Sequence, residues 1–417
     1  MLKKWGSDME SKEKLGACQS NKNKKSKIGG FAIPMMLCAV LLMLVIGSGV
    51  LSVSTQCRVF SIHSSSQMAA RCAADAGITQ ALYEMNKKLK VLPWNNSSLP
   101  ELTDEILPDT DATYSYAVTG DLTGGHFAKS IGKYGREERT IHCSFPLQGV
   151  FEYAIFGDQY VHLKSGGTIT CYNCDTDDKS LQVGTNNILA GSLDLKSGAI
   201  VNGDAVIGVG GDPDAVISDE SGGIKGNTFI MPKEHELPQV TVPQWLASMP
   251  SGGTLHSNKT INNSGKYDKI DLGNSKVITI KGQVNLYIVG DVVLDNAAEL
   301  RLADANDVSL TLFVGGNIEV KNGGVINNLT EDAKKLKIYG LNSCQNIVLK
   351  NGSDFYGAIY TPNADIVMMN SGDAYGSVIA KSVEQKNSST FHYDVSLRQV
   401  SIEDIGVRFV IKQWREE

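Results

Sequence analysis

Arginine is scarce in the second half of this chain, and the usual metal and nucleotide motifs are missing from it. Arg301 is the only arginine between Arg139 and Arg398, which leaves few groups that could clamp an anionic substrate. The seven histidines form no His-x3-His or His-Glu-x-x-His arrangement. The stretch GVGGDPD at 208–214 lacks the Lys-Ser/Thr of a phosphate loop. Common metal-hydrolase and nucleotide-binding functions therefore have no support in the sequence.

Paired carboxylates for glycan cleavage are also hard to find. The acidic stretches 174–180 and 211–221 lie in turn-rich segments, where acids usually face solvent or cap turns. Neither has the spacing of an EF-hand or of a nonapeptide calcium repeat. An envelope glycan-active enzyme, with Asp212 and Asp214 as its carboxylates, is the weakest alternative. We expect no enzymatic activity, no cofactor and no metal site.

Positive charge is concentrated at the start of the chain. Residues 1–30 contain eight lysines against three acidic residues, whereas the chain from Phe31 onward has 31 basic and 42 acidic residues, a net charge of −11. A body of this charge repels phosphate backbones, so we expect no nucleic acid as partner.

A run without charge follows the lysines. Residues 31–51 contain only one polar side chain, Ser48, and as a helix would span roughly 31 Å, which matches a bilayer core. The lysines before the run predict a cytoplasmic N-terminus and a body outside the cytoplasm. A cleaved secretory signal is the alternative, but the run is long for one and no clean cleavage site follows it.

The helical pattern continues beyond this run. Residues 52–90 contain no proline, and their apolar residues recur at steps that suit one helix face. These residues are Met68, Cys72, Ile78, Leu82 and Met85. We expect the helix to end before Pro93.

This region resembles the type IV pilin-like proteins, in particular the PilX-type minor pilins. The resemblance rests on a basic leader that ends in Gly30-Phe31, on the apolar helix, and on the continuation RCAADAGITQALYEMN with its Ala73–Gly77 segment. It implies cleavage by a prepilin peptidase between Gly30 and Phe31 and methylation of Phe31. Pilin-like subunits and the peptidase are then the expected partners, together with the membrane.

One position departs from the pilin pattern. Major pilins carry Glu at the fifth mature position, and here that position is Met35, directly after Pro34. The resemblance then favours a minor subunit over the bulk subunit of a filament. The alternative is that Gly29 and Gly30 form a flexible joint before an ordinary membrane anchor.

Alternating segments follow the helix. ATYSYAVTG and REERTIHCSFPL, both within 109–150, alternate apolar and polar residues and flank a turn-rich joint at 120–125. They predict a small pilin-like sheet.

A repeat then fills residues 151–397. Its unit is a short alternating arm closed by Asn or Ser, as in VHLKS, LDLKS, VVLDN, IEVKN and IVLKN. Ser165 and Ser197 close the first two copies. The later copies end at Asn296, Asn322, Asn351, Asn370 and Asn387.

These arms are too closely spaced for crossover helices, so we predict a right-handed β-solenoid, or β-helix. Alternation places two sets of residues inward, namely Leu286, Ile288, Val292 and Leu294 in one coil and Leu312, Val314, Ile318 and Val320 in the next. The asparagines are interpreted as structural corners, because Asn tolerates positive φ.

This block resembles an uncharacterised β-solenoid domain found at the C-terminus of many PilX-like envelope proteins. The resemblance covers roughly residues 150–397 and is most specific in FYGAIYTPNADI and FHYD. It implies architecture and location, and no activity. The bactofilins share the pattern more weakly.

The eight cysteines carry little information. Cys171 and Cys174 lack the second pair that a tetrahedral zinc site needs, and they lie outside a thioredoxin-like βαβ context. A local disulfide and two free thiols both remain open.

Together these patterns predict a mainly β protein that carries a long N-terminal membrane-spanning helix. Its parts are a leader (1–30), the helix (31–90), a small pilin-like sheet (91–150), a β-solenoid (151–397) and a capping strand (398–417). The leading hypothesis is a non-enzymatic minor component of a type IV pilus or pseudopilus that displays its solenoid at the cell surface. The alternative is a membrane-anchored adhesin whose solenoid binds surface glycan or self-associates, without a role in a pilus.

Overall fold

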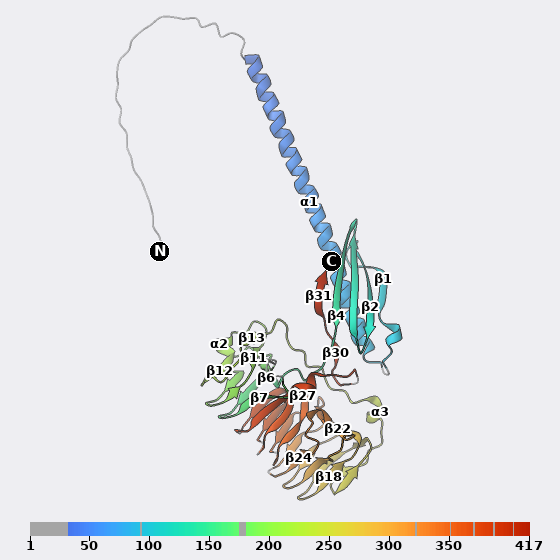
Figure 1. Ribbon diagram of the computed structural model, residues 1–417, viewed down its shortest axis with the longest axis vertical. Helices are drawn as coiled ribbons and strands as arrows, with labels where there is room; N and C mark the ends of the chain where they lie inside the picture. The colour runs from blue at the N-terminus through green and yellow to red at the C-terminus, as the bar shows by residue number, and fades with distance from the viewer. Residues whose placement is uncertain are drawn as a thin grey trace, which may run out of the picture. The chain divides into compact units, whose positions relative to one another are not determined.

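The computed structural model shows a mainly β protein with one long N-terminal helix (Figure 1). It describes residues 32–91, 94–174, 181–321, 323–350, 352–369, 372–386, 388–402 and 404–417. The chain divides into two compact units, Met1–Ala69 and Ala70–Glu417. Gly30 and Phe31, the predicted cleavage site, lie outside the described residues.

Helix α1 (Ala32–Lys88) is 57 residues long. Pro34 falls in its first turn, where the missing N–H costs nothing, and Lys87 and Lys88 complement the helix dipole in the last turn. Its most apolar 18-residue window has a mean hydropathy of 2.6 and is fully exposed. By length and composition, this helix could cross a membrane.

The last turns of α1 pack on an antiparallel sheet of five strands in the order β1-β2-β3-β4-β31. These strands are β1 (Glu101–Ile106), β2 (Thr113–Asp121), β3 (Gly125–Tyr134), β4 (Glu137–Phe145) and β31 (Lys412–Glu416), and a short 3-10 turn η1 (Asn96–Ser98) precedes them. Ala74, Ile78, Ala81 and Met85 are buried against the sheet, with the spacing of one helix face. We call residues 70–88 and this sheet the head.

Small residues let the helix and the sheet of the head come very close. A Cβ added to Gly132 on β3 would lie 2.0 Å from the carbonyl oxygen of Ala70 and 2.3 Å from the backbone nitrogen of Ala74. Gly77 on the helix approaches Ser130 in the same way. The small side chains of the predicted Ala73–Gly77 segment therefore serve close packing on β3.

The rest of the chain forms a stack of parallel strands. Its main sheet contains β6 (Ile155–Leu163), β7 (Thr168–Tyr172), β8 (Gln182–Thr185), β9 (Leu193–Leu195), β10 (Ile200–Val201), β11 (Asp204–Ile207), β12 (Ile217–Asp219), β13 (Thr228–Ile230), β14 (Thr254–Leu255), β16 (Gly265–Tyr267), β17 (Lys269–Leu272), β19 (Gln283–Ile288), β20 (Val292–Leu294), β22 (Ser309–Val314), β23 (Ile318–Val320), β25 (Leu336–Gly340), β26 (Asn346–Leu349), β27 (Phe355–Met368), β28 (Ala374–Gln385) and β29 (Thr390–Asp394). A second parallel sheet holds β15 (Lys259–Ile261), β18 (Val277–Ile280), β21 (Glu299–Leu302) and β24 (Val325–Asn328). The short elements α2 (Pro213–Val216), α3 (Gln244–Ala247), η2 (Ala333–Lys335), η3 (Val395–Arg398), β5 (Leu147–Gln148) and β30 (Arg408–Phe409) complete the chain.

The predicted inward residues form the core of the stack. Leu286, Ile288, Val292, Leu294, Leu312, Val314 and Val320 have no exposed surface, and Ile318 is 1% exposed. Equivalent positions pair in register from strand to strand, as in Leu286↔Leu312↔Ile338 across β19, β22 and β25. The alternation was therefore assigned to the correct face throughout both coils.

The strands do not stack in chain order. One ladder runs β13-β11-β8-β6-β28-β27-β25-β22-β19-β16, with every pair parallel. The chain thus enters the middle of the stack at β6, builds outward to β13, crosses to the opposite end, and builds back inward until β28 meets β6. Figure 1 shows β12 and β13 at one end of the stack, β18 at the other, and β6, β7 and β27 between them.

Residues 231–253, here called the crossing segment, connect the two ends along an aromatic row. The row consists of outward-facing residues in register on successive strands, namely Tyr287, Phe313, Tyr339, Tyr360 and, beyond Ile379, Phe156. Met231, Val240 and Leu246 of the segment are buried in the same cluster, and the Tyr360 hydroxyl donates to the carbonyl of Pro238 at 2.6 Å. The segment therefore supplies a second hydrophobic core outside the stack.

The structure describes one of the five asparagine corners. Asn296 lies in the turn between β20 and β21, but the positive φ of that turn belongs to the next residue, Ala297, at 57°. Gly166 and Gly198 take the same place after Ser165 and Ser197, with φ of 78° and 77°. We expected the positive φ at the asparagine itself, whereas at the Asn296 corner it belongs to the residue that follows. Asn322, Asn351, Asn370 and Asn387 lie outside the described residues.

The C-terminal segment forms a strand, as expected, with a different partner. We expected residues 398–417 to cap the stack, whereas β31 pairs antiparallel with β4 of the head. Just before it, β30 pairs with β5, and the backbone nitrogen of Phe409 donates to the Asn86 side chain at 2.8 Å. The segment thus closes the head sheet.

Candidate functional site

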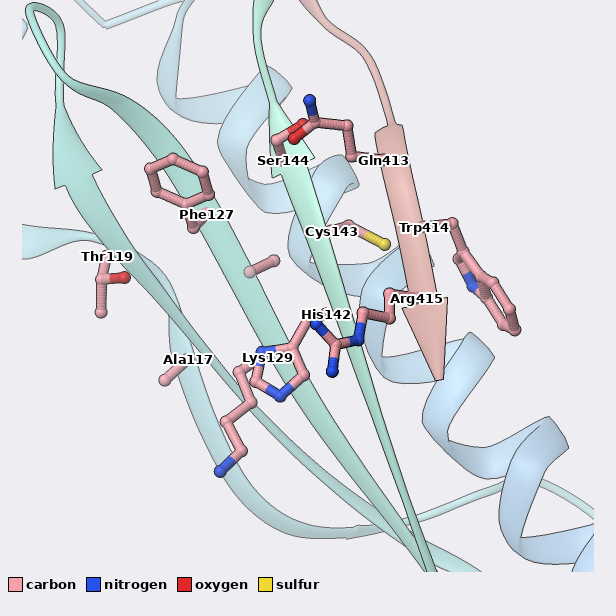
Figure 2. A pocket seen from close by; sticks show the side chains of 11 residues that line it. Ala117, Thr119, Phe127, Lys129, His142, Cys143, Ser144, Gln413, Trp414 and Arg415 are labelled. Carbon is pink, nitrogen blue, oxygen red and sulfur yellow. The ribbon is translucent and has the colours of Figure 1, made fainter. Parts of the chain in front are cut away.

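A hollow lies on the head sheet, where β3, β4 and β31 run side by side. It has a volume of about 780 Å³. The residues of interest in its lining are Phe127, Lys129, His142, Cys143, Trp414 and Arg415, and we call it the sheet cleft (Figure 2). Half of the surface of Phe127 and 41% of that of Trp414 are exposed, so two large aromatic side chains meet solvent there.

Three basic side chains lie in a row across the cleft. Lys129 on β3 is paired with His142 on β4, and His142 is paired with Arg415 on β31. Figure 2 shows the three side chains together on one face of the sheet, with Phe127 on the same face. Lys129 and Arg415 carry positive charge on the two strands that flank His142, so this row favours an anionic partner.

One carboxylate already lies near the row. Glu417 is 3.4 Å from His142 Nε2 and 3.4 Å from an Arg415 nitrogen. All three side chains are well exposed, so these pairs contribute little stability. Lys129 makes no ion pair within the described part of the chain.

Trp414 holds the other side of β31 to the helix. Its indole N–H donates to Asp75 at 3.2 Å, and the Arg71 guanidinium lies 5.3 Å from the ring centroid. Arg71 is also 3.3 Å from Glu416. The edge strand is thus positioned by helix residues of the head, which gives the cleft a defined shape.

The thiol in the cleft is not an activated nucleophile. Burial, and to a smaller extent the nearby carboxylate of Asp75, raise the pKa of Cys143 to about 11. At neutral pH the group therefore stays a thiol, and the thiolate is the reactive form.

In the acidic stretch 211–221, Asp212 and Asp219 hold turns, whereas residues 175–180 of the other acidic stretch lie outside the described residues. Asp212 caps α2 by accepting from the backbone nitrogen of Asp214. Asp219 accepts from the backbone nitrogens of Ser221, Gly223 and Ile224. Burial raises the pKa of Asp219, but these donors together outweigh it and hold the pKa below its usual value. Among the described residues, no three His, Cys, Asp or Glu side chains gather as a metal site would require.

The stack carries a smaller, polar hollow of about 480 Å³ beside a column of stacked rings. Tyr356 stacks on Tyr375 and Tyr375 on His392, each pair with ring centroids 4.3 Å apart and planes within 9°. Tyr356 ends the column at the hollow, which Asn327 and Glu331 also line. An aromatic ring beside planar polar side chains is an arrangement that can hold a sugar ring.

Cys171 and Cys174 form a disulfide. This outcome resolves the alternative that the sequence left open. The bridge spans the turn after β7 and leaves no CxxC thiol pair for metal binding.

Comparison with known proteins adds one domain match. Residues 233–400, from the crossing segment to η3, match a domain of unknown function (DUF7305). No relative is found among curated proteins. Among solved structures, the competence-associated pilin ComZ from Thermus thermophilus aligns with 13% identity and a TM-score of 0.23, covering 84% of this chain and 97% of that one. A glycosylated ice-binding protein (LeIBP) from an Arctic yeast aligns with 10% identity and a TM-score of 0.25, covering 61% of this chain and 94% of that one. Scores this low carry no argument about fold or function.

The sheet cleft was not predicted from the sequence, although a signal for it exists. No lysine or arginine occurs between Lys90 and Lys129, while residues 101–111 contain five acids. The basic residues Lys129, Arg139 and Arg415 all fall on β3, β4 and β31. Charge is therefore separated across the sheet, which becomes visible only once β31 is known to join it.

Proposed function

We propose that this chain is a non-enzymatic, pilin-like envelope protein of the PilX type, and a minor component of a type IV pilus or pseudopilus. In this proposal the first part of α1 spans the membrane, residues 1–30 lie in the cytoplasm, and the parallel stack is a β-solenoid displayed at the cell surface. Pilin-like subunits and a prepilin peptidase are its partners.

The observation that carries the proposal is the division of α1 into two functional parts. Its first part is apolar and exposed, while its last turns pack on an antiparallel sheet through Ala74, Ile78, Ala81 and Met85. A single helix that is both membrane-compatible and the spine of a small antiparallel head is the arrangement that a pilin-like subunit needs. Met35, where major pilins have Glu, supports a minor role.

The stack supports display more than catalysis. Its core is continuous through parallel strands in register, and Asp212 and Asp219 cap turns. Repetitive parallel stacks offer long regular surfaces that suit contact with a partner.

Mass spectrometry of the mature N-terminus tests this function. From native membranes we expect a chain that begins with N-methylated Phe31, and Gly30→Leu should abolish the cut. Gly29→Ala is the matched control and should leave processing unchanged. An intact Met1, or an N-terminus beyond residue 52, would refute the pilin-like assignment.

The polar hollow on the stack favours a second candidate, a surface protein that binds glycan. Binding would use the ring of Tyr356 and the side chains of Asn327 and Glu331. A glycan array probed with the full chain in detergent should then give hits that Tyr356→Ala removes and Tyr287→Ala, in the aromatic row, leaves unchanged. The absence of any Tyr356-dependent hit would eliminate this candidate.

A further inference from the structure

The two edges of the head sheet differ in charge. β1, at one edge, and the turn after it carry Glu101, Asp104, Glu105, Asp109 and Asp111, all exposed. Within the described residues none of these five forms an ion pair. The row of Lys129, His142 and Arg415 in the sheet cleft runs from the central strand β3 across β4 to the opposite edge strand, β31. The β1 edge is therefore acidic, whereas on the other side of the sheet Glu416 and Glu417 already contact arginines beside the basic row.

The apolar features of the two edges are also complementary. Ile106, at the end of β1, is 63% exposed and directly follows Glu105 in the chain. The sheet cleft is a hollow whose apolar lining includes Phe127, half exposed, beside the basic row. The exposed side chain of Ile106 beside acidic residues is complementary to the apolar cleft beside the basic row. An apolar centre with charged residues at its border is the usual pattern of an interface core and its polar rim.

Neither edge is built for strand addition. The pairing of β1 with β2 is interrupted between Leu102 and Glu105, where Asp104 has a φ of 50°. The pairing of β31 with β4 is interrupted between Lys412 and Arg415, where Gln413 has a φ of 53°. Bulges of this kind protect edges against backbone pairing, so contact must come from side chains.

We propose that a second copy of this chain docks head to tail, with its acidic β1 edge in the sheet cleft of the first. Ile106 enters beside Phe127, and Glu101 and Glu105 face Lys129 and Arg415. Because the two patches differ, the contact is heterologous and leaves one free patch at each end, so it extends into an open chain or a ring. The inference rests on the proposed function and names the surface through which such subunits meet.

The contact is expected to be weak and dependent on salt. The surface that lines the hollow is smaller than the area that a stable protein–protein interface buries, and its charged side chains are exposed. Raising salt from 50 to 500 mM shortens the screening length from about 14 Å to about 4 Å. We therefore expect association of the full chain in detergent to fall at least tenfold over that range, measured by sedimentation velocity.

Charge reversal gives the decisive test. Lys129→Glu/Arg415→Glu makes the cleft acidic like the β1 edge, and Glu101→Lys/Glu105→Lys reverses the two acids that face Lys129 and Arg415 in the proposed contact, so each variant alone should be monomeric. Mixing the two should restore association with alternating copies, because the acidic β1 edge of the first variant fits the unmodified cleft of the second, and the reversed edge of the second fits the acidic cleft of the first. Asp304→Lys/Asp307→Lys, at exposed positions of the stack, is the matched control and should associate like the unmodified chain.

Several outcomes would overturn the proposal. They are a monomer at all salt concentrations, association that survives in either charge-reversed variant, or a mixture that stays monomeric while both variants keep the unmodified unfolding temperature. If a reversal unfolds the head, Ile106→Ser at its exposed position must still reduce association. The N-terminal mass is read from the same samples. A processed Phe31 without association refutes this interface alone, and salt-dependent association without processing refutes the pilin-like function alone.

Discussion

Replacing Gly132 by alanine tests how closely the head sheet packs on α1. The added Cβ would lie 2.0 Å from the carbonyl oxygen of Ala70 and 2.3 Å from the backbone nitrogen of Ala74. Because backbone atoms cannot rotate away, the helix must move about 1 Å to restore ordinary contact, and the buried side chains of Ile78 and Met85 would move with it.

The expected cost is at the upper end for overpacking, about 3 kcal/mol. At roughly 4–8 °C per kcal/mol for a domain of about 60–100 residues, the unfolding temperature of the head should fall by about 12–24 °C. Tryptophan fluorescence reports on this transition, since Trp94 contacts Phe409 in the head core with ring centroids 5.7 Å apart.

Gly124→Ala is the matched control. A Cβ there would meet only the Asp121 side chain, at 3.5 Å, so the change should be nearly neutral. If Gly132→Ala unfolds within 2 °C of the unmodified protein, or if Gly124→Ala is equally destabilised, the close packing of β3 on α1 is refuted.

Three further changes probe the stack and the crossing segment. Burial, with Arg408 nearby, lowers the pKa of His235 to about 4, so the unfolded chain binds the proton first and stability falls as pH drops from about 6.5 towards 4. The free energy of unfolding should fall by about 2–3 kcal/mol over this range. In His235→Phe the unfolding temperature should depend less on pH, and an unchanged pH dependence would contradict this explanation. Tyr360→Phe removes the hydrogen bond to the crossing segment, which is worth about 1 kcal/mol. Tryptic cleavage within the crossing segment should therefore become about fivefold faster. Tyr339→Phe is the control, and equal cleavage rates in the two variants would refute the role of that bond. Leu294→Ala should cost about 2–5 kcal/mol in denaturant unfolding, against less than about 1 kcal/mol for outward Val293→Ala, and equal costs would contradict the inward assignment.

The features that could be predicted from the sequence are those that depend on the spacing of apolar residues within a short segment. The long helix follows from the apolar run and from the absence of proline in residues 52–90, and α1 ends at Lys88, two residues before the predicted end. The inward positions of the stack follow from strict alternation, because a strand has only two faces. Both signals lie within a few residues of the structure that they specify.

The order of the strands in the stack could not be predicted in this way. Every coil presents similar aliphatic residues on its inner face, so any coil could stack on any other, and chain order is the simplest assumption. The aromatic row was hidden for the same reason. Tyr287 and Phe313 occupy outward positions, which alternation assigns to solvent, and only the crossing segment makes them a core.

The partner of the last strand was equally hidden. The sequence KQWRE is compatible with a strand, but a short alternating segment does not specify which other strand it pairs with. Its contacts are with residues more than two hundred positions earlier, as in Trp414 with Asp75 and Phe409 with Asn86. The sheet cleft, and the charge separation across the head, depend on this long-range pairing.

The two late pairings have a common consequence for assembly. β28 pairs with β27 on one side and β6 on the other, and β29 pairs with β28 and β7. In the head, β31 pairs with the edge of β4. Until these last strands are present, both β6 and β4 expose an unpaired edge, and such edges invite pairing with other chains. The contacts that close them join residues far apart in the chain, which makes closure slow. A chain whose sheet cleft includes β31 can therefore present that cleft only after the whole chain has folded, and this couples the proposed docking at the cleft to completion of the stack.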